Sequence, residues 1–356
     1  MLLQTGGRRN VRYSDRVTVI GWDIGGVHTK VARVSGGVVQ TVQSRPYEIQ
    51  RDPQALVPSL HALQAEVAAG FVGPHAVTMT AELSQMFRTK REGVCFVLNA
   101  VERAFPVAVV RVFAVDGRFL EPGAARAQPL AVAAANWAAT ARVVADHHPD
   151  AILVDVGSTT TDIIPIAGGV VVALGRTDPE RLASGELVYT GVLRTPTEAI
   201  ASHVPLGDVL AGVSAEGFAL AGDVHVWRGD LDPSDYTCST PDGRPATRDY
   251  AGERVARVVC ADRDMLDDDA ITRIADALAE AQVQTVRAAI ERVRARHPSA
   301  RLAVVTGLGT FLGAAAARAA GLDVVPLSIT LGAAAARCAP AAAVALLLEQ
   351  ECAEAA

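Results

Sequence analysis

The chain has 356 residues, of which 50% are hydrophobic and 20% are charged. At about 100–200 residues per domain this length suggests two domains, and the apolar fraction excludes a disordered chain. The formal net charge of −6 lacks the basic surface that nucleic-acid binding requires, so no nucleic-acid partner is expected. The longest uncharged run, Leu302–Ala317, is shorter than the ~20 residues that cross a bilayer. We therefore expect no membrane partner either.

The cysteines and the first residues of the chain indicate in which cellular compartment the protein is found. The five cysteines are scattered, with no CxxC pair and no short-spaced Cys/His cluster, so neither a disulfide framework nor a structural zinc site is expected. Arg8-Arg9 resembles a twin-arginine signal, but Asp23 interrupts the apolar stretch that follows and a cleavage region is missing. We expect residues 1–16 to be a mobile leader and the protein to be cytoplasmic.

Residues 17–146 have the pattern of an α/β domain. The β-branched run Val17–Trp22 ends in a small-residue turn and predicts a strand. Residues 29–34 and 38–42 flank two glycines, which predicts a hairpin. Beyond it, a leucine-spaced helix at 53–69 precedes a strand at 76–80, and a further strand is predicted at 107–113. A hairpin followed by alternating helices and strands indicates an α/β layer structure.

The same layout returns in the second half of the chain. An apolar strand at 151–155 ends in aspartate and enters a turn of small residues, and residues 161–167 and 170–174 again flank two glycines. This repeat indicates a duplicated domain, which we place at 147–340.

Three segments complete the predicted organisation of the second half. An irregular insertion is predicted at 175–262, and residues 341–356 are predicted to form a terminal helix or tail. Between them, Asp267-Asp268-Asp269 caps a long helix, and an apolar strand at 302–306 enters a glycine-containing turn.

The turn after the first strand carries a candidate anion site. In Asp23-Ile24-Gly25-Gly26, Gly25 and Gly26 let backbone N–H groups approach an anion closely, while Thr29 and Lys30 add a hydroxyl and an ammonium. Asp23, at the strand end, is a candidate ligand of Mg²⁺. A plain structural hairpin explains this segment equally well.

The second turn is a stronger indication. Four consecutive hydroxyl residues, 158–161, stand beside the strand-end carboxylate of Asp155, and hydroxyls of this kind favour turns over sheet ladders. Two matching turns in two repeats predict a shared polyphosphate site, in which Asp155 is the second Mg²⁺ ligand. Asp162 is either a further metal partner or a cap of the turn. The residues of this turn predicted to cradle the phosphates are Gly157, Ser158, Thr159 and Thr160.

Two further features support a phosphate site. Gly307-Leu308-Gly309 follows an apolar strand, and we expect Gly307 and Gly309 to let the backbone pass close to a ligand. Only two of the 33 basic residues are lysines, Lys30 and Lys90, and both lie in motif-like segments. We infer that a compact ammonium is needed at these positions in place of a planar guanidinium.

The three turns described above, each a candidate phosphate-binding loop, follow one another in an order that resembles the actin/Hsp70/sugar-kinase superfamily. Further segments narrow the resemblance to hydantoinase A/oxoprolinase-related proteins linked to tetrahydromethanopterin-dependent one-carbon transfer, whose archaeal relatives act in methanofuran biosynthesis. These segments are residues 78–83, 89–94 and 115–119, Ala134 with Asn136-Trp137, and 185–191 with Arg194-Thr195-Pro196. The resemblance implies two duplicated RNase H-like (actin-like ATPase) α/β domains that face each other across a cleft.

The resemblance also implies a reaction. An (aminomethyl)furanmethyl diphosphate would condense with the phenol of a γ-glutamyl-tyramine or tyrosine-type acceptor and release diphosphate, with Mg²⁺ as cofactor. The protein would then be a transferase of an alkyl or aryl group other than methyl, with small molecules as its substrates.

Catalytic roles are assigned to Glu82, Lys90 and Asp155. Lys90 would bind the leaving group, and Glu82 would orient or deprotonate the phenol. An ordinary ion pair at a helix start explains Glu82 and Lys90 equally well. Tyr189 and Arg194 are candidates for contact with the glutamyl part of the acceptor.

Other readings stay open at this point. The phosphate turns alone also permit an ATP-dependent small-molecule kinase or a hydantoinase/oxoprolinase-like hydrolase. A nucleotide-binding scaffold without turnover is a third reading. The sequence leaves a homo-oligomer open.

Overall fold

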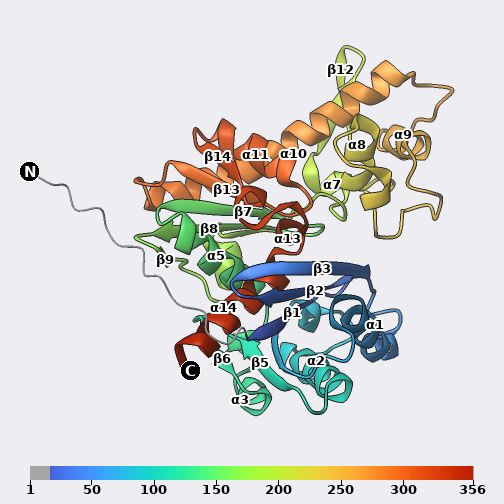
Figure 1. The fold of residues 1–356 in the computed structure, drawn as a ribbon. Coiled ribbons are helices and arrows are strands. Elements are labelled where there is room, and N and C mark those ends of the chain that lie inside the picture. Colours follow the sequence, from blue (N-terminus) through green and yellow to red (C-terminus); the bar gives the residue numbers. More distant parts are fainter. Residues whose placement is uncertain (1–16, 356) are drawn as a thin grey trace, which may run out of the picture.

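The computed structural model describes residues 17–355. The predicted leader, residues 1–16, lies outside the described residues. The chain forms two α/β domains, each built on one central sheet (Figure 1). No helix within residues 17–355 is both long enough and apolar enough to span a membrane.

The first sheet has six strands in the order β3-β2-β1-β4-β5-β6. Strands β1, β2 and β3 are successive antiparallel neighbours, whereas β4 runs parallel to β1 and β5 parallel to β4, as the predicted hairpin and alternation require. The strands are β1 (Thr18–Ile24), β2 (His28–Ser35), β3 (Val38–Pro46), β4 (Pro74–Met79), β5 (Val109–Phe113) and β6 (Phe119–Leu120).

Two helices cover one face of this sheet. The leucines of α1 and the valines of α2 lie fully buried against Trp22 and Val77 from the strands, which explains the helical spacing seen in the sequence. Short elements complete this side. The elements are η1 (Pro53–Ala55), α1 (Leu56–Ala68), η2 (Ala81–Leu83), α2 (Lys90–Ala104), α3 (Pro122–Ala127) and α4 (Pro129–Val132).

The second sheet repeats the plan of the first. Its order is β10-β8-β7-β13-β14, with β9 paired to the edge of β8. Strands β7 and β8 are antiparallel and β13 runs parallel to β7, as β4 does to β1, which supports an internal duplication. The strands are β7 (Ala151–Val156), β8 (Thr161–Ala167), β9 (Val170–Val171), β10 (Leu187–Val188), β13 (Leu302–Thr306) and β14 (Asp323–Pro326).

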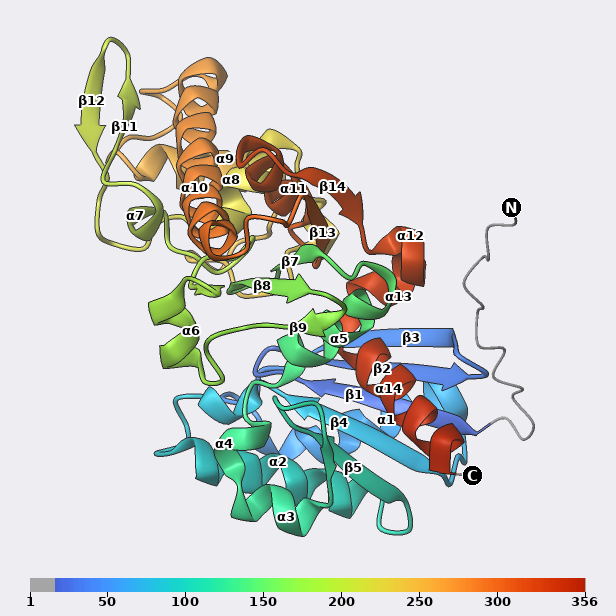
Figure 2. The ribbon, with the colours of Figure 1, turned by 90° about the vertical axis from the view of Figure 1, so that its left-hand side faces the viewer.

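Helices α5 (Asn136–His147) and α14 (Ala339–Ala355) lie between the sheets of the two domains. Helix α5 packs on β7, β8 and β9, α14 packs on β1, β2 and β4, and the two helices pack on each other (Figure 2). The predicted terminal helix therefore lies on the sheet of the first domain. The contact is close, because a Cβ atom on Gly21 would lie 2.0 Å from the carbonyl oxygen of Ala341.

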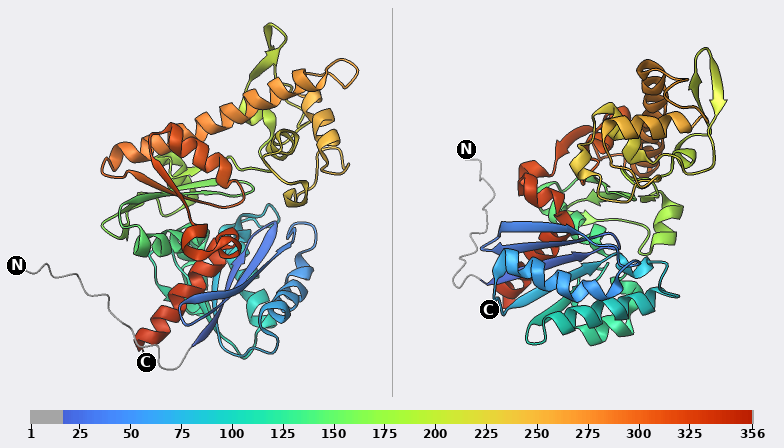
Figure 3. Two further views of the ribbon diagram at one scale, coloured as in Figure 1. Left: turned by 45° about the horizontal axis from the view of Figure 1, so that its top comes forward. Right: turned by 90° about the vertical axis from the view of Figure 1, so that its right-hand side faces the viewer.

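The predicted insertion builds a helical subdomain on the long helix α10 (Asp268–Arg296). Asp267 caps α10 by accepting a hydrogen bond from the backbone N–H of Ala270. Helices α8 and α9 pack against this helix at one end of the molecule (Figure 3). The elements are α6 (Asp178–Ser184), α7 (Thr197–Ile200), β11 (His203–Leu206), β12 (Val209–Gly212), α8 (Ala221–Arg228), η3 (Pro233–Asp235) and α9 (Arg248–Arg257).

The remaining helices follow β13 and β14. Helix α11 packs on β7 and β13, opposite the face that α5 covers, and the last two short helices lead into α14. They are α11 (Thr310–Ala319), α12 (Ser328–Leu331) and α13 (Ala333–Arg337). As a result, the carboxyl ends of β1 and β7, where the two aspartate turns begin, meet at the junction of the two domains.

Candidate active site

The cleft between the two domains has two lobes that share one wall. The first lobe, about 490 Å³, adjoins β3, α13 and the turn after β13, and the second, about 460 Å³, adjoins η2, the start of α2 and α6. The shared wall comes mainly from the two aspartate turns. We count with this wall Asp155 and Thr159 of the second aspartate turn, which line the first and the second lobe respectively. The residues that line both lobes are Asp23, His28, Lys30, Asn136, Gly157, Ser158, Thr160 and Asp162.

Asp23 and Lys30 face each other from paired strands. They are register partners in β1 and β2, and Lys30 Nζ lies 3.6 Å from Asp23 Oδ2. Oδ1 of Asp23 is buried and has no hydrogen-bond partner within the described part of the chain. Burial raises the pKa of Asp23 despite the neighbouring ammonium. Gly25 and Gly26 line the second lobe beside this pair.

The structure corrects the role predicted for Thr29. Its side chain is fully buried and does not line either lobe, because successive residues of β2 point to opposite faces of the sheet. His28, its neighbour, lines both lobes instead. Burial lowers the pKa of His28 to about 4, helped by Lys30 and Arg194, so this imidazole is neutral at physiological pH.

The second aspartate turn lines the opposite side of the cleft. Asp155 lines the first lobe together with Asp23, and Thr159 lines the second lobe. The backbone N–H of Gly157 donates to the carbonyl of Thr160 at 2.9 Å and closes the turn. Burial, together with the nearby carboxylate of Asp162, raises the pKa of Asp155 to about 7. The two aspartates that the duplication predicted to meet thus share one cavity.

A backbone segment, residues 190–194, holds the second turn from behind. The N–H groups of Val192 and Leu193 donate to the carbonyls of Gly157 and Ser158 at 3.0 and 3.1 Å. A Cβ atom on Gly191 would lie 2.5 Å from the backbone nitrogen of Thr159, so this close approach requires glycine.

A buried side chain of α10 fixes that segment in turn. Gln282 donates through Nε2 to the hydroxyl of Thr190 at 2.8 Å and to the carbonyl of Gly191 at 2.9 Å. Its Oε1 lies 2.9 Å from His225 Nε2 in α8. The insertion therefore supports the second turn through α10.

The glycine loop after β13 contributes one residue of the predicted pair. Gly307 lines the first lobe with a φ of +87°, and a Cβ there would lie 2.4 Å from Asp155 Oδ1. The prediction that Gly309 lies beside the ligand is not confirmed, because this glycine lines neither lobe. It packs against β7 instead, where a Cβ would lie 2.5 Å from Val156 Cγ1.

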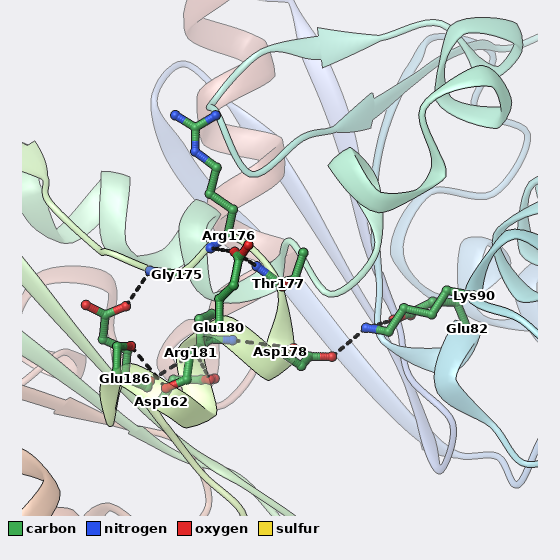
Figure 4. Close-up of polar contacts among 11 residues, drawn as sticks. Glu82, Lys90, Asp162, Gly175, Arg176, Thr177, Asp178, Glu180, Arg181 and Glu186 are labelled. Carbon is green, nitrogen blue, oxygen red and sulfur yellow. Dashed lines mark hydrogen bonds and ion pairs between the residues drawn. The ribbon is translucent and has the colours of Figure 1, made fainter.

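Glu82 and Lys90 line the second lobe. Figure 4 shows them opposite Asp178. Lys90 Nζ lies 3.5 Å from Glu82 Oε1 and donates a hydrogen bond of 2.5 Å to Asp178 Oδ2. Glu82 is 1% exposed, and neither of its carboxylate oxygens has a hydrogen-bond partner among residues 17–355. Burial raises the pKa of Glu82 to about 7, although Lys90 lowers it.

Sequence reasoning missed the partners that α6 supplies to the second lobe. Asp178 pairs with Lys90 across the cleft, and Arg181 pairs with Asp162 and stacks 4.4 Å over the ring of Trp137. Asp162 is thus bound to Arg181 within its own domain. The capping box of Thr177 and Glu180 gave a signal for the helix start, but no local signal indicated that this helix faces the cleft.

The carboxylates of the shared wall fit a magnesium ion that is bound together with a polyphosphate. Among residues 17–355 no group of three or more Asp, Glu, His or Cys side chains is arranged to hold a metal ion. Mg²⁺ needs fewer protein ligands, because it is bound through one or two carboxylates and the oxygens of substrate phosphates. Asp23, with its unpartnered Oδ1, and Asp155 supply those two carboxylates on one cavity.

The fold is the predicted one, two actin-like α/β domains. The chain is similar to a solved structure of acetone carboxylase in its nucleotide-free form, with 13% identity, a TM-score of 0.56, and coverage of 93% of this chain and 70% of that one. At this identity the similarity concerns the fold alone.

The family follows from the sequence comparisons. The chain belongs to the hydantoinase/oxoprolinase family, whose model matches residues 74–351. It is 37% identical over 295 residues to the (4-{4-[2-(γ-L-glutamylamino)ethyl]phenoxymethyl}furan-2-yl)methanamine synthase of Methanocaldococcus jannaschii, covering 83% of this chain and 87% of the relative. A synthase of the same name from Methanococcus vannielii is 37% identical over 158 residues, which are 44% of this chain and 70% of the relative.

Proposed function

We propose that this protein is a biosynthetic transferase of methanofuran-type cofactors. It would condense an (aminomethyl)furanmethyl diphosphate with the phenol of a γ-glutamyl-tyramine or tyrosine-type acceptor. The observation that carries the proposal is the shared wall, where Asp23 and Asp155 line one cavity beside two backbone turns. The relatives support it through their name, which describes an aryl ether joined to a furanylmethanamine.

The reaction breaks one C–O bond and forms another. The bond between the furan-bearing methylene carbon and the diphosphate oxygen breaks, and its electron pair leaves with the diphosphate. The phenol oxygen then bonds to that carbon and loses its proton. Since the furan oxygen and ring donate electrons to the methylene carbon, most of the difficulty lies in stabilising charge on the leaving group.

The residues of the shared wall would supply that stabilisation. Asp23 and Asp155 would hold Mg²⁺, which supplies positive charge to a leaving diphosphate when bound. Burial opposes charge on Lys30, but the surrounding carboxylates, led by Asp23, raise the pKa of its ammonium, which stays a cation for the diphosphate. The hydroxyls of Ser158, Thr159 and Thr160 line the cavity and would donate to phosphate oxygens.

The second lobe offers contacts for both substrates beside the shared wall. Apolar side chains of the second lobe, Leu83, Leu182 and Leu187, would contact an aromatic ring, and Tyr189 and Arg194 line the same lobe. Arg194 is exposed at this position and would meet a glutamyl carboxylate. The expectation that Glu82 orients or deprotonates the phenol stays a prediction.

The direct test supplies both substrates with Mg²⁺ and follows two products. We expect the coupled ether, identified by mass, to appear with one equivalent of diphosphate. A parallel reaction with ATP in place of the furan diphosphate tests for kinase or hydrolase activity. The proposal would be contradicted if the first reaction formed no ether while the reaction with ATP phosphorylated a small molecule or released ADP.

A further inference from the structure

The carboxylate of Glu82 is an unsatisfied acceptor inside the second lobe. Neither Oε1 nor Oε2 accepts a hydrogen bond from any described residue, and the side chain is 1% exposed. A buried carboxylate without hydrogen-bond donors is costly, since it has lost its hydration and is offset here only by the ion pair with Lys90. Lys90 approaches Oε1 to 3.5 Å but donates its hydrogen bond to Asp178 (Figure 4).

The fold leaves the backbone of Glu82 little room to shift. Glu82 lies in η2, directly after β4, and α2 packs over it through Gly93. A Cβ atom on Gly93 would lie 2.5 Å from both the Cα and the carbonyl oxygen of Glu82. The same helix begins at Lys90, one turn earlier. The carboxylate is therefore a preorganised part of the second lobe.

When all its carboxylates are ionised, the charge network around Glu82 has one negative charge in excess. The connected network holds three carboxylates, from Glu82, Asp178 and Asp162, and two cations, from Lys90 and Arg181. Lys90 is hydrogen-bonded to Asp178, and Arg181 to Asp162. The carboxylate left without a hydrogen-bonded cation is that of Glu82, so the network calls for a cationic group from a ligand.

Two free acceptor oxygens also favour a group with several donors. A phenol offers one O–H, whereas a primary ammonium offers three N–H donors and a full positive charge. The synthases similar to this chain are named for a furanyl methanamine, so the furan substrate of the proposed reaction carries a primary amine. On the proposed function, the methylene that bears the diphosphate stands on C4 of the furan ring and the aminomethyl group on C2, as in the product that names these synthases.

We propose that Glu82 binds the primary ammonium of the furan substrate while the shared wall holds its diphosphate. This inference rests on the proposed function and assigns Glu82 to substrate recognition in place of phenol deprotonation. It predicts that the enzyme selects furan diphosphates that carry an aminomethyl group. The furan ring would then span the second lobe from the aspartate turns to η2.

The test compares two furan diphosphates in the wild-type protein and in Glu82→Gln. One substrate carries the aminomethyl group, and the other carries a methyl group in its place. We expect Glu82→Gln to lower kcat/KM at least 30-fold for the aminomethyl substrate, mainly through KM, and less than threefold for the methyl analogue. Glu121→Gln, which neutralises a carboxylate with 74% exposure, is the matched control and should change neither value.

Two results would overturn the inference. An equal loss of kcat with both substrates, together with loss of the acidic limb of the pH–rate profile, would identify Glu82 as the base for the phenol. An unchanged kcat/KM for both would remove Glu82 from the reaction.

A binding measurement keeps the inference separate from the proposed function. Calorimetric titration with (4-methylfuran-2-yl)methanamine needs no turnover, and 2,4-dimethylfuran serves as the neutral control ligand. We expect the amine to bind the wild-type protein and to lose at least tenfold in affinity with Glu82→Gln. If wild-type protein forms no ether but Glu82-dependent amine binding persists, the proposed function fails and the ammonium site stands. Amine binding that is absent, or unaffected by Glu82→Gln, would contradict the ammonium site.

Discussion

Lys90 Nζ and Asp178 Oδ2 lie 2.5 Å apart and connect the two domains across the mouth of the second lobe. Lys90 begins α2 of the first domain, whereas Asp178 begins α6 of the second. Both side chains are largely shielded from solvent, at 18% and 16% exposure, so the pair is less screened than a surface ion pair. It joins the start of α2 to the start of α6.

The Lys90–Asp178 pair should show energetic coupling between the domains. We expect Lys90→Ala and Asp178→Asn each to lower the free energy of unfolding, and the double variant to lose less than the sum. The coupling should be about 1 kcal/mol or more, the upper end for exposed pairs. Denaturant unfolding of the four proteins measures it, with the exposed Arg88→Ala as the control. Strictly additive losses would mean that the pair does not join the domains.

Lys30 should be required as lysine. We expect Lys30→Ala to weaken the binding of Mg²⁺–diphosphate at least tenfold, because the ammonium beside Asp23 is the cation of the shared wall. Lys30→Arg should recover only part of the affinity, since a planar guanidinium does not fit a site built around a compact charge. Calorimetric titration measures both. Full recovery by arginine would show that any cation suffices at this position.

The second aspartate turn should be sensitive to bulk at Gly191. A methyl group there would lie 2.5 Å from the backbone nitrogen of Thr159, so Gly191→Ala must shift the turn. We expect diphosphate affinity and the rate of ether formation to fall at least tenfold, with a smaller loss of stability. Gly212→Ala is the matched control, because the described structure leaves open space around that glycine. Equal effects of the two substitutions would separate residues 190–194 from the turn.

The buried carboxyl of Glu82 should make the stability of the ligand-free protein depend on pH. Its pKa rises from 4.5 to about 7 on folding, because burial outweighs the cation of Lys90, and Asp178 adds to the rise. The folded state then binds a proton that the unfolded state has released, so the contribution of Glu82 to stability falls from about pH 4.5 to pH 7.

The variant Glu82→Gln removes this dependence. We expect its Tm, relative to that of the wild-type protein, to rise between pH 5 and pH 8 by about 2 °C or more, since 1 kcal/mol shifts Tm by about 2–4 °C in chains of 150–250 residues. Thermal unfolding monitored by circular dichroism at both pH values measures the difference. A relative Tm that is the same at pH 5 and pH 8 would show that the folded pKa is close to 4.5.

Much of the fold was predictable because its signals are local. The two hairpins follow from paired glycines between β-branched runs, and Gly36 and Gly168 indeed have positive φ values in their turns. The duplication followed from the repeated order of these signals. By contrast, the packing of α14 on the first sheet depends on Gly21 meeting Ala341, a contact between residues 320 positions apart, and no local pattern encodes it.

The candidate site was predictable only in part. Asp23, Lys30 and Asp155 could be chosen because they stand in motif-like turns at strand ends. Thr29 was wrongly assigned to the cleft. Strand β2 already begins at His28, and because alternate residues of a strand point to opposite faces of the sheet, the side chain of Thr29 points away from the cleft. Arg181 could not be found from the sequence, because its importance comes from an ion pair that only the folded chain forms.

The most direct test of this account compares two ligands of the shared wall. Thermal unfolding is measured with Mg²⁺ and either inorganic diphosphate or ATP, in the wild-type protein and in Asp155→Asn. A ligand at 100 times its Kd stabilises a protein by about 2.7 kcal/mol, which is easily detected. The account predicts stabilisation of the wild-type protein by Mg²⁺–diphosphate, loss of that effect in Asp155→Asn, and no effect of ATP. Stabilisation by Mg²⁺–ATP with none by Mg²⁺–diphosphate would contradict it.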